Sequence, residues 1–196
     1  MAKDRPLLIL ASSSPWRRQL LRQLGVRFEA TAPDVDETAL PGEPPIDLAR
    51  RLARAKAERV ASMWPEAIVI GSDQVADVNG TILGKPGSRE RAIEQLQQQS
   101  GQTVYFHTGL CVCAPGLDTP LLTVETVTTT FRELGDDEIR RYVAAEDVTA
   151  TAGSIKSEGL GIALVESIQS RDPSTLVGLP LIALRHFLAR VGIAVP

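Results

Sequence analysis

The sequence predicts an α/β fold built around a mixed β-sheet. Segments with helical periodicity alternate with short apolar or β-branched segments along the chain, and no repeat, linker or low-complexity segment separates them. The dipeptide Asn79-Gly80 is typical of two-residue hairpin turns, so it adds an antiparallel pair of strands. Because 43% of the 196 residues are hydrophobic, we expect residues 1–196 to form a single domain with a substantial core.

Local signals locate most of the elements. The run "LLILA" predicts a buried strand at 7–11, and Ser14 followed by Pro15 predicts the start of a helix that Gly25 closes. Ser88 is expected to cap a helix that extends to about Gln99. Further helices are expected at about 46–63, 136–144 and 180–190, and further strands on both sides of Asn79-Gly80, at 103–113, at 121–131 and after the loop 152–161.

The helix expected at 46–63 carries a lysine on its apolar face. Leu48, Leu52, Val60 and Met63 form one stripe, and Lys56 falls on that same stripe. Burying an ammonium group is costly unless it meets an anion. Lys56 therefore either meets a carboxylate or a ligand, or covers the core with its stem while its head reaches water.

The expected hairpin brings a second lysine close to an acidic residue. Counting back from its turn, the register puts Gln74 opposite Lys85 and Asp73 opposite Pro86. Asp73 follows the apolar run "AIVIGS", so it is expected at the carboxyl end of a buried strand, where open α/β sheets bind ligands. The plain alternative is a surface salt bridge between Asp73 and Lys85, worth about 0–1 kcal/mol.

The segment "SSSPWRR" is a candidate anion site. Free backbone N–H groups and the positive end of a helix dipole both favour an anion there. Ser12 and Ser14 add hydroxyl donors, and Arg17 adds a forked cation. The alternative is an ordinary serine cap followed by surface arginines.

Two carboxylates could hold a hard divalent cation. Asp73 and Glu37, the latter in the acidic segment "DVDET", are the candidates, and the ion would bridge phosphate oxygens and help to activate a water molecule. The Cys111 and Cys113 pair is interpreted as two reduced thiols, with a Cys-x-Cys metal site as the alternative.

Composition and charge exclude several partners. The net charge of -3 and a pI of about 5.5 provide no overall basic field, so duplex nucleic acid is not an expected partner. No apolar run approaches the roughly 20 residues of a membrane span, and no signal segment opens the chain. We expect a soluble cytoplasmic protein.

Seven sequence blocks resemble one protein family. They are "LILASSSPWRRQLL", "VDE", "ARAKA", "IGSDQV", "GKP", "AGSIKSEG" and "LVGLPL", and their order and spacing resemble those of the Maf proteins over nearly the whole chain. The resemblance implies a cytoplasmic nucleoside triphosphate pyrophosphatase that uses a divalent cation, Mg²⁺ or Mn²⁺, and releases a nucleoside monophosphate and pyrophosphate. It also implies a homodimer and a fold like that of inosine triphosphate pyrophosphatases, with a curved mixed sheet and two lobes around a cleft.

The resemblance assigns roles to the residues already singled out. It implies that Asp73 is the proton acceptor and that Glu37 belongs to the active site. It also implies that Lys56 and Lys85 bind the triphosphate. Ser14 and Arg17, together with Ser12, are expected to bind phosphate.

Three positions depart from the branch of the family that hydrolyses dTTP and UTP. Trp16, Gln74 and Glu158 stand at its specificity positions and resemble the branch that hydrolyses 7-methylguanosine triphosphate. Methylation at N7 gives the purine a positive charge, which an indole face attracts. Glu158 can accept hydrogen bonds from guanine. A dTTP or UTP pyrophosphatase and a nucleotide-binding regulator of septum formation are the alternatives.

Overall fold

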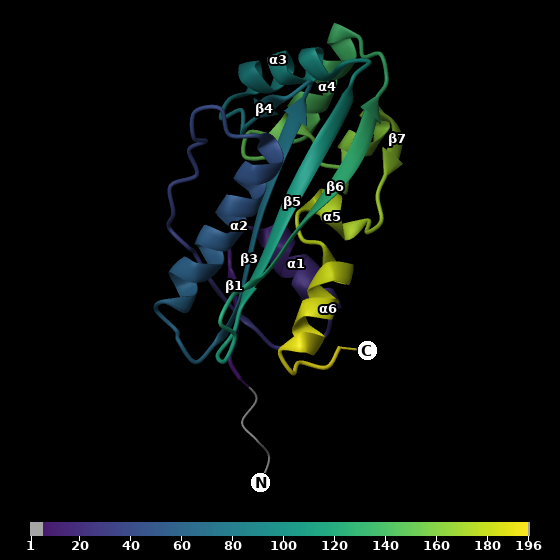
Figure 1. The fold of residues 1–196 in the computed structure, drawn as a ribbon. Helices are drawn as coiled ribbons and strands as arrows, with labels where there is room; N and C mark the ends of the chain where they lie inside the picture. The colour runs from purple at the N-terminus through teal and green to yellow at the C-terminus, as the bar shows by residue number, and fades with distance from the viewer. Residues whose placement is uncertain (1–5, 196) are drawn as a thin grey trace.

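A seven-stranded mixed sheet forms the centre of the computed structural model, which describes residues 6–195. Six strands follow the order β2-β1-β3-β5-β6-β7, and β4 pairs with β3 (Figure 1). The strands are β1 (Leu8–Ala11), β2 (Glu29–Thr31), β3 (Ile68–Val78), β4 (Thr81–Leu83), β5 (Thr103–Cys113), β6 (Leu121–Phe131) and β7 (Val165–Gln169). The α-helices are α1 (Pro15–Gln23), α2 (Pro45–Ala61), α3 (Arg89–Gln99), α4 (Asp136–Ala145), α5 (Ser174–Val177) and α6 (Leu181–Arg190), and two 3-10 helices are η1 (Ala152–Ser154) and η2 (Leu160–Leu164).

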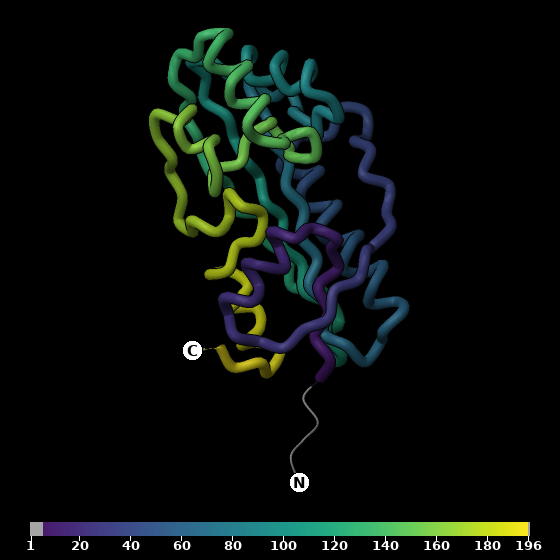
Figure 2. The backbone as a smooth tube through the Cα atoms, turned by 180° about the vertical axis from the view of Figure 1, so that it is seen from behind, coloured from purple at the N-terminus to yellow at the C-terminus, as the bar shows by residue number. Residues whose placement is uncertain are grey.

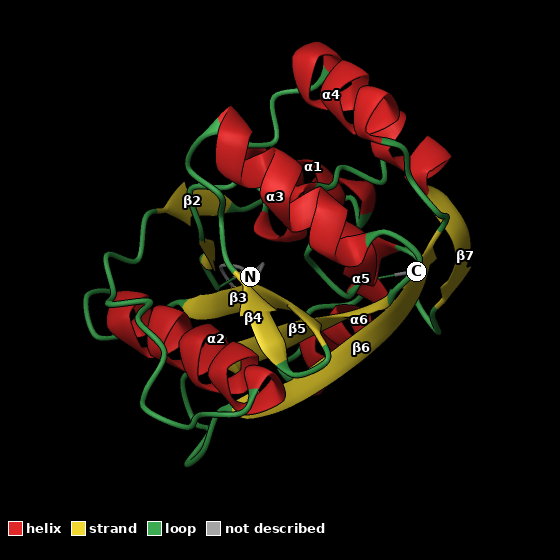
Figure 3. Cartoon of the chain, turned by 90° about the horizontal axis from the view of Figure 1, so that it is seen from above, coloured by secondary structure: helices red, strands yellow, loops and turns green. Residues whose placement is uncertain are grey.

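The sheet is parallel at one end and antiparallel through the rest. β1 runs parallel to both β2 and β3, whereas β5, β6 and β7 each pair antiparallel with the preceding strand of the sheet. The sheet is curved, with α2 on one face and α1, α3 and α4 on the opposite side (Figure 3). The predicted α/β fold with a curved mixed sheet is therefore confirmed.

The core on the face opposite α2 divides into two clusters. Apolar side chains of α3 and α4 pack on the part of β3 and β5 near Ala76 and Phe106, which we call the α3–α4 cluster. Apolar side chains of α1 and α6 pack near Ile70 and Leu110 and form the α1–α6 cluster. The long strands β3, β5 and β6 contribute to both, so one sheet supports two lobes.

Local sequence signals account for the element boundaries. Ser14 caps α1 by accepting the Arg17 N–H, and Ser88 caps α3 in the same way. Positive φ angles at Asn79 and Gly80 form the predicted hairpin turn. Met63 does not lie on the buried stripe of α2, because that helix ends at Ala61 and leaves the Met63 side chain 46% exposed.

The segment 32–44 follows β2 and runs along the side of the molecule to the start of α2 (Figure 2). This segment carries Glu37, one of the predicted site residues. None of the helices within residues 6–195 combines the length and the apolar character that crossing a membrane requires.

Candidate active site

The predicted site lies where β3 has a free edge. β1 pairs with β3 only as far as Gly71, and β4 pairs with it only from Ala76. Within the described part of the chain, residues 72–75 of β3 therefore have no neighbouring strand on that side. The serine segment leaves β1 at this gap, so backbone donors and the side chains of β3 share one edge of the sheet.

Lys56 joins two carboxylates in this gap. Its Nζ lies 2.5 Å from Asp73 Oδ1 and 2.5 Å from Glu37 Oε1, and Lys56 and Asp73 are both buried. Partial burial raises the pKa of Glu37, but the hydrogen bonds and charges of Lys56 and Lys85 outweigh it, so this pKa lies below its ordinary value. Lys56 thus meets carboxylates, as the first of the two sequence hypotheses expected.

Two glycines allow α2 to approach the sheet closely enough for this contact. A Cβ atom at Gly71 would lie 2.3 Å from the Ala53 carbonyl oxygen, and one at Gly109 would lie 2.2 Å from the Ala49 carbonyl oxygen. Gly109 is the partner of Asp73 in the β3–β5 ladder. The absence of both side chains lets the helix deliver Lys56 to the sheet.

Lys85 enters the site by a different route from the one predicted. The expected pairing of Gln74 with Lys85 and of Asp73 with Pro86 does not form, because β4 ends at Leu83 and the ladder stops at Ala76. Lys85 Nζ instead lies 3.3 Å from Glu37 Oε2. Lys85 therefore contacts Glu37 on the segment 32–44, and it is not brought to Asp73 by strand pairing in the hairpin.

Internal hydrogen bonds fix the serine segment and Arg17, and phosphate binding by Ser12, Ser14 and Arg17 stays a prediction. The Ser14 N–H donates to Ser12 Oγ at 3.1 Å, and Arg17 Nε donates to the Gly178 carbonyl oxygen at 2.8 Å. Burial lowers the pKa of Arg17, while the charges of Asp73 and Glu37 oppose this shift. Arg17 is therefore electrostatically coupled to the carboxylates of the site.

Sequence reasoning missed the group that holds Arg17. Ser72 Oγ also donates to the Gly178 carbonyl oxygen, at 3.0 Å, and to that of Gly109, at 2.8 Å. Gly178 ends α5 with a φ of 116°, a conformation that favours glycine. The glycine within "LVGLPL" was the available signal, but its partners lie more than 100 positions away in the chain.

Two other missed residues anchor the segment that carries Glu37. Arg51 Nε lies 2.6 Å from Glu43 Oε1, and Arg51 Nη2 donates to the Thr38 carbonyl oxygen at 3.0 Å. Hydrogen bonds from Arg51 and from the Leu40 N–H lower the pKa of Glu43 to about 2. Arg51 thereby ties the segment 32–44 to α2.

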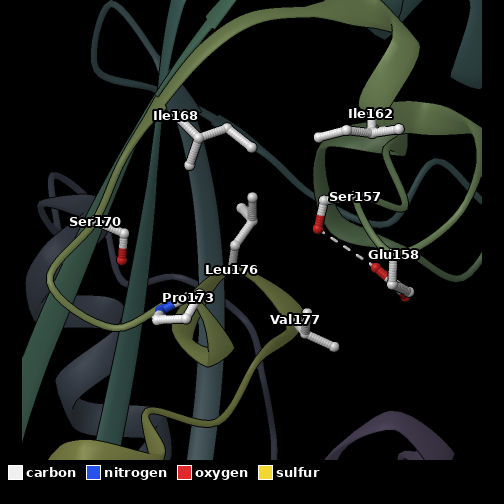
Figure 4. Close-up of a pocket in the computed structure, with 8 residues that line it drawn as sticks. All are labelled: Ser157, Glu158, Ile162, Ile168, Ser170, Pro173, Leu176 and Val177. Atoms are coloured by element: carbon white, nitrogen blue, oxygen red, sulfur yellow. Dashed lines mark hydrogen bonds between the residues drawn. The ribbon is translucent and has the colours of Figure 1, made fainter.

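Trp16 lies against the loop that carries Glu158. Trp16 is 37% exposed, and Lys156 Nζ lies 5.9 Å from the centre of its ring, within the range of a cation–π contact. Glu158 and Ser157 line a pocket of about 350 Å³, opposite Ile168 (Figure 4). A loop between α4 and β7 thus meets the first turn of α1.

Gln74 points to the face of β3 opposite that of Asp73, and there it contacts α5. Its Nε2 donates within 3.0 Å to Thr108 Oγ1 and to the carbonyl oxygens of Thr175 and Leu176. Leu176 also lines the pocket that contains Glu158. Gln74 is therefore linked to the pocket through α5, and a direct contact between Gln74 and a base stays a prediction.

Within the described residues, neither the two thiols nor the acidic groups form a complete metal site by themselves. Cys111 is buried and Cys113 partly buried, and both are free thiols; the hydrogen bond with Cys113 and then burial raise the pKa of Cys111. Within residues 6–195 no group of three or more His, Cys, Asp or Glu side chains could hold a metal ion. A cation at Glu37 and Asp73 would therefore need ligands from the substrate as well.

The residues of the site lie within a region that matches a known protein family. A family model described as "Maf-like protein" matches residues 7–191. The chain belongs to the Maf family. The resemblance drawn from the seven sequence blocks is thereby confirmed, and the Lys56–Asp73–Glu37 cluster and the serine segment both lie within the matched residues.

Close relatives within the Maf family share one name. A protein of Polaromonas sp. named 7-methyl-GTP pyrophosphatase is 54% identical over 97% of this chain and 87% of its own length. Proteins of the same name from Bordetella pertussis and Nitrosococcus oceani are 53% and 50% identical, and the aligned regions cover at least 95% of this chain and 94% of each relative. A solved structure, that of the Staphylococcus aureus Ham1 protein, aligns with a TM-score of 0.48 at 18% identity, covering 77% of this chain and 87% of that one.

Proposed function

We propose that this Maf protein hydrolyses 7-methylguanosine triphosphate to the monophosphate and pyrophosphate. The observation that carries the proposal is the meeting of Trp16 with the loop of Glu158, next to Arg17, whose guanidinium group is electrostatically coupled to Asp73 and Glu37. An indole and a carboxylate suit a cationic purine, and lysines beside carboxylates suit a triphosphate. The names of the relatives support the same substrate.

The reaction requires a water molecule to attack the α phosphorus. Lys56 holds Asp73 Oδ1, and within residues 6–195 no hydrogen bond is formed to Oδ2, so this oxygen is the one that accepts the proton of the attacking water. A new bond forms between the water oxygen and the α phosphorus, and the bond from that phosphorus to the bridging oxygen breaks. Pyrophosphate leaves, while Lys56, Lys85 and Arg17 balance its growing charge.

A divalent cation fits the carboxylates of the site. Mg²⁺ and Mn²⁺ prefer oxygen ligands, and Mg²⁺ is commonly held by one or two carboxylates together with substrate phosphates. Glu37 and Asp73, which flank the same ammonium group, would hold it. When bound, the cation supplies positive charge to the phosphates and lowers the pKa of a coordinated water.

The base is proposed to lie between Trp16 and Glu158. The indole ring already attracts Lys156, a cation of the chain itself, and the 7-methylguanine ring carries the same sign of charge. Glu158 is exposed at the pocket and can accept hydrogen bonds from N1–H and the amino group of guanine, which a pyrimidine does not present in that arrangement.

A substrate panel tests the proposal. With Mg²⁺ present, we expect kcat/KM for 7-methyl-GTP to exceed that for GTP, dTTP and UTP, and we expect Trp16→Arg combined with Glu158→Gln to shift preference towards pyrimidines. The loss of the cation–π contact alone accounts for roughly 2- to 30-fold. Trp64→Arg, at a similarly exposed tryptophan beyond α2, is the matched control and should leave the preference unchanged.

The two alternatives give different results in the same assays. Selective turnover of dTTP or UTP by the wild-type protein would overturn the proposed substrate and leave the family assignment intact. A wild-type protein that binds nucleotides without releasing pyrophosphate would be a regulator. For an enzyme, Asp73→Asn abolishes turnover while nucleotide binding persists.

A further inference from the structure

The turn that carries Glu158 is held by the side chains of Tyr142, in α4, and of Glu146, the residue that directly follows this helix. The Lys156 N–H donates to the Tyr142 hydroxyl oxygen at 3.0 Å, and the Leu160 N–H donates to Glu146 Oε2 at 2.8 Å. The other carboxylate oxygen, Glu146 Oε1, lies 3.8 Å from Lys156 Nζ. Both ends of the turn 156–160 are thus fixed by side chains at the C-terminal end of α4, and Glu158 stands between them.

The fit between this turn and α4 is close. A Cβ atom at Gly159 would lie 2.5 Å from Glu146 Oε2, and one at Gly161 would lie 2.9 Å from the Tyr142 hydroxyl oxygen. Tyr142 is itself buried, and burial raises its pKa to about 12, so the hydroxyl stays neutral at working pH. Glycine at both positions leaves the anchoring oxygens in contact with the backbone of the turn.

The Glu158 side chain has little else to fix it. It is exposed, and its hydrogen bond within the described residues comes from Ser157 Oγ at 3.5 Å, which is a long and weak contact. The position of its carboxylate therefore depends on the backbone of the turn. The same turn carries Lys156, whose ammonium group lies over Trp16, so the anchors on α4 also set how the turn meets the indole.

We propose that Glu146 and Tyr142 are positioning residues for base recognition, which set the place of Glu158 relative to Trp16. This inference rests on the proposed reading of the base by Glu158. The two residues act through hydrogen bonds to the backbone of the turn and touch neither the triphosphate nor the Lys56–Asp73–Glu37 cluster. Their loss should therefore weaken binding of the base and leave the chemical step intact.

Double-variant kinetics test this inference. We expect Glu146→Ala to raise the KM for 7-methyl-GTP about tenfold, a size typical of residues coupled within one network. We expect kcat to change little, because the lost contact serves binding and not the chemical step. Glu146→Gln keeps an oxygen for the Leu160 N–H and should lose less. Tyr142→Phe removes only the hydroxyl group, so it keeps the test usable if Glu146→Ala does not fold. Asp137→Ala, an exposed acidic residue of the same helix, is the matched control and should change neither constant.

The decisive comparison repeats these substitutions in a Glu158→Gln background. If Glu146 acts through Glu158, Glu146→Ala then raises KM by less than about twofold. An equal rise in both backgrounds, or a fall in kcat with KM unchanged, overturns the inference and leaves the proposed function standing. If Glu158→Gln by itself leaves the KM for 7-methyl-GTP unchanged, the reading of the base by Glu158 fails, and the inference fails with it.

Discussion

At the scale of single residues, Lys56 organises the charges of the site. An ammonium group this deeply buried is tolerated because Asp73 and Glu37 both face it at 2.5 Å. Its partners come from a strand and from an irregular segment, so the lysine links α2, β3 and the segment 32–44 at a single point. In the proposed reaction the same charge stabilises the phosphates.

Replacing this lysine should damage both stability and activity. Lys56→Met leaves the buried Asp73 carboxylate without its partner, which we expect to lower the free energy of unfolding by about 3 kcal/mol. We expect kcat/KM to fall by a factor on the order of 100 or more, because positive charge at the phosphates is lost. Urea denaturation and steady-state kinetics measure the two effects.

The control for Lys56→Met lies on the same helix. Arg54 has an exposed side chain that pairs with Glu58, so Arg54→Met should change the free energy of unfolding by less than about 1 kcal/mol. Equal stability of the two variants would contradict the view that the Lys56–Asp73 contact is a buried ion pair.

At the scale of elements, the packing of α2 on β3 and β5 decides the geometry of the site. Gly71 and Gly109 remove the side chains that would hold the helix away from the sheet. Lys56 lies one turn beyond Ala53, the residue whose carbonyl oxygen approaches Gly71. A displacement of the helix therefore moves the lysine away from Asp73.

A single methyl group should be enough to cause this displacement. Gly109→Ala puts a Cβ atom 2.2 Å from the Ala49 carbonyl oxygen, so we expect a loss of about 1–3 kcal/mol in the free energy of unfolding and a fall in kcat/KM. Thermal denaturation and kinetics measure both. Gly84→Ala, whose new methyl group meets no atom within 4 Å, is the control for stability, and a Gly109→Ala variant with wild-type activity and stability would refute the close-packing argument.

At the scale of the whole molecule, two apolar clusters are separated by polar residues. Ser72, Gln74 and Thr108 lie on the same face as the α3–α4 and α1–α6 clusters, and all three donate hydrogen bonds to backbone oxygens of the 174–178 segment. The site borders this polar zone. The gap between the two apolar clusters therefore lets hydrogen-bonding side chains lie in the interior of the protein, on a sheet that is itself continuous.

Because β5 passes through both clusters, we expect them to unfold together. Phe106→Ala in the α3–α4 cluster and Leu110→Ala in the α1–α6 cluster should each cost about 2–5 kcal/mol, and scanning calorimetry should show one transition at a lower Tm in both cases. Ile182→Ala, at a side chain 52% exposed on α6, should leave Tm almost unchanged. Two resolved transitions in either core variant would mean that the lobes unfold separately.

Much of the fold could be predicted from local signals. Ser14, Ser88 and Asn79-Gly80 act through bonds to near neighbours, so their elements begin or turn where the sequence indicates. The three-residue strand β2 and the four-residue helix α5 are too short to show a period and were not predicted. The homodimer and the cytoplasmic location stay predictions.

The sequence by itself determined most of the longer elements, because caps, turns and periodicity act over a few residues. Its ordered blocks also indicated the family and the charged groups that are candidates for the site. Only the tertiary structure decided how those groups meet. Lys85 reaches Glu37 and not Asp73, Arg17 is held by Gly178, and Tyr142 and Glu146 at the end of α4 hold the turn of Glu158. Such contacts join positions far apart in the chain, and they depend on where strands end and how closely helices pack, which no local pattern encodes.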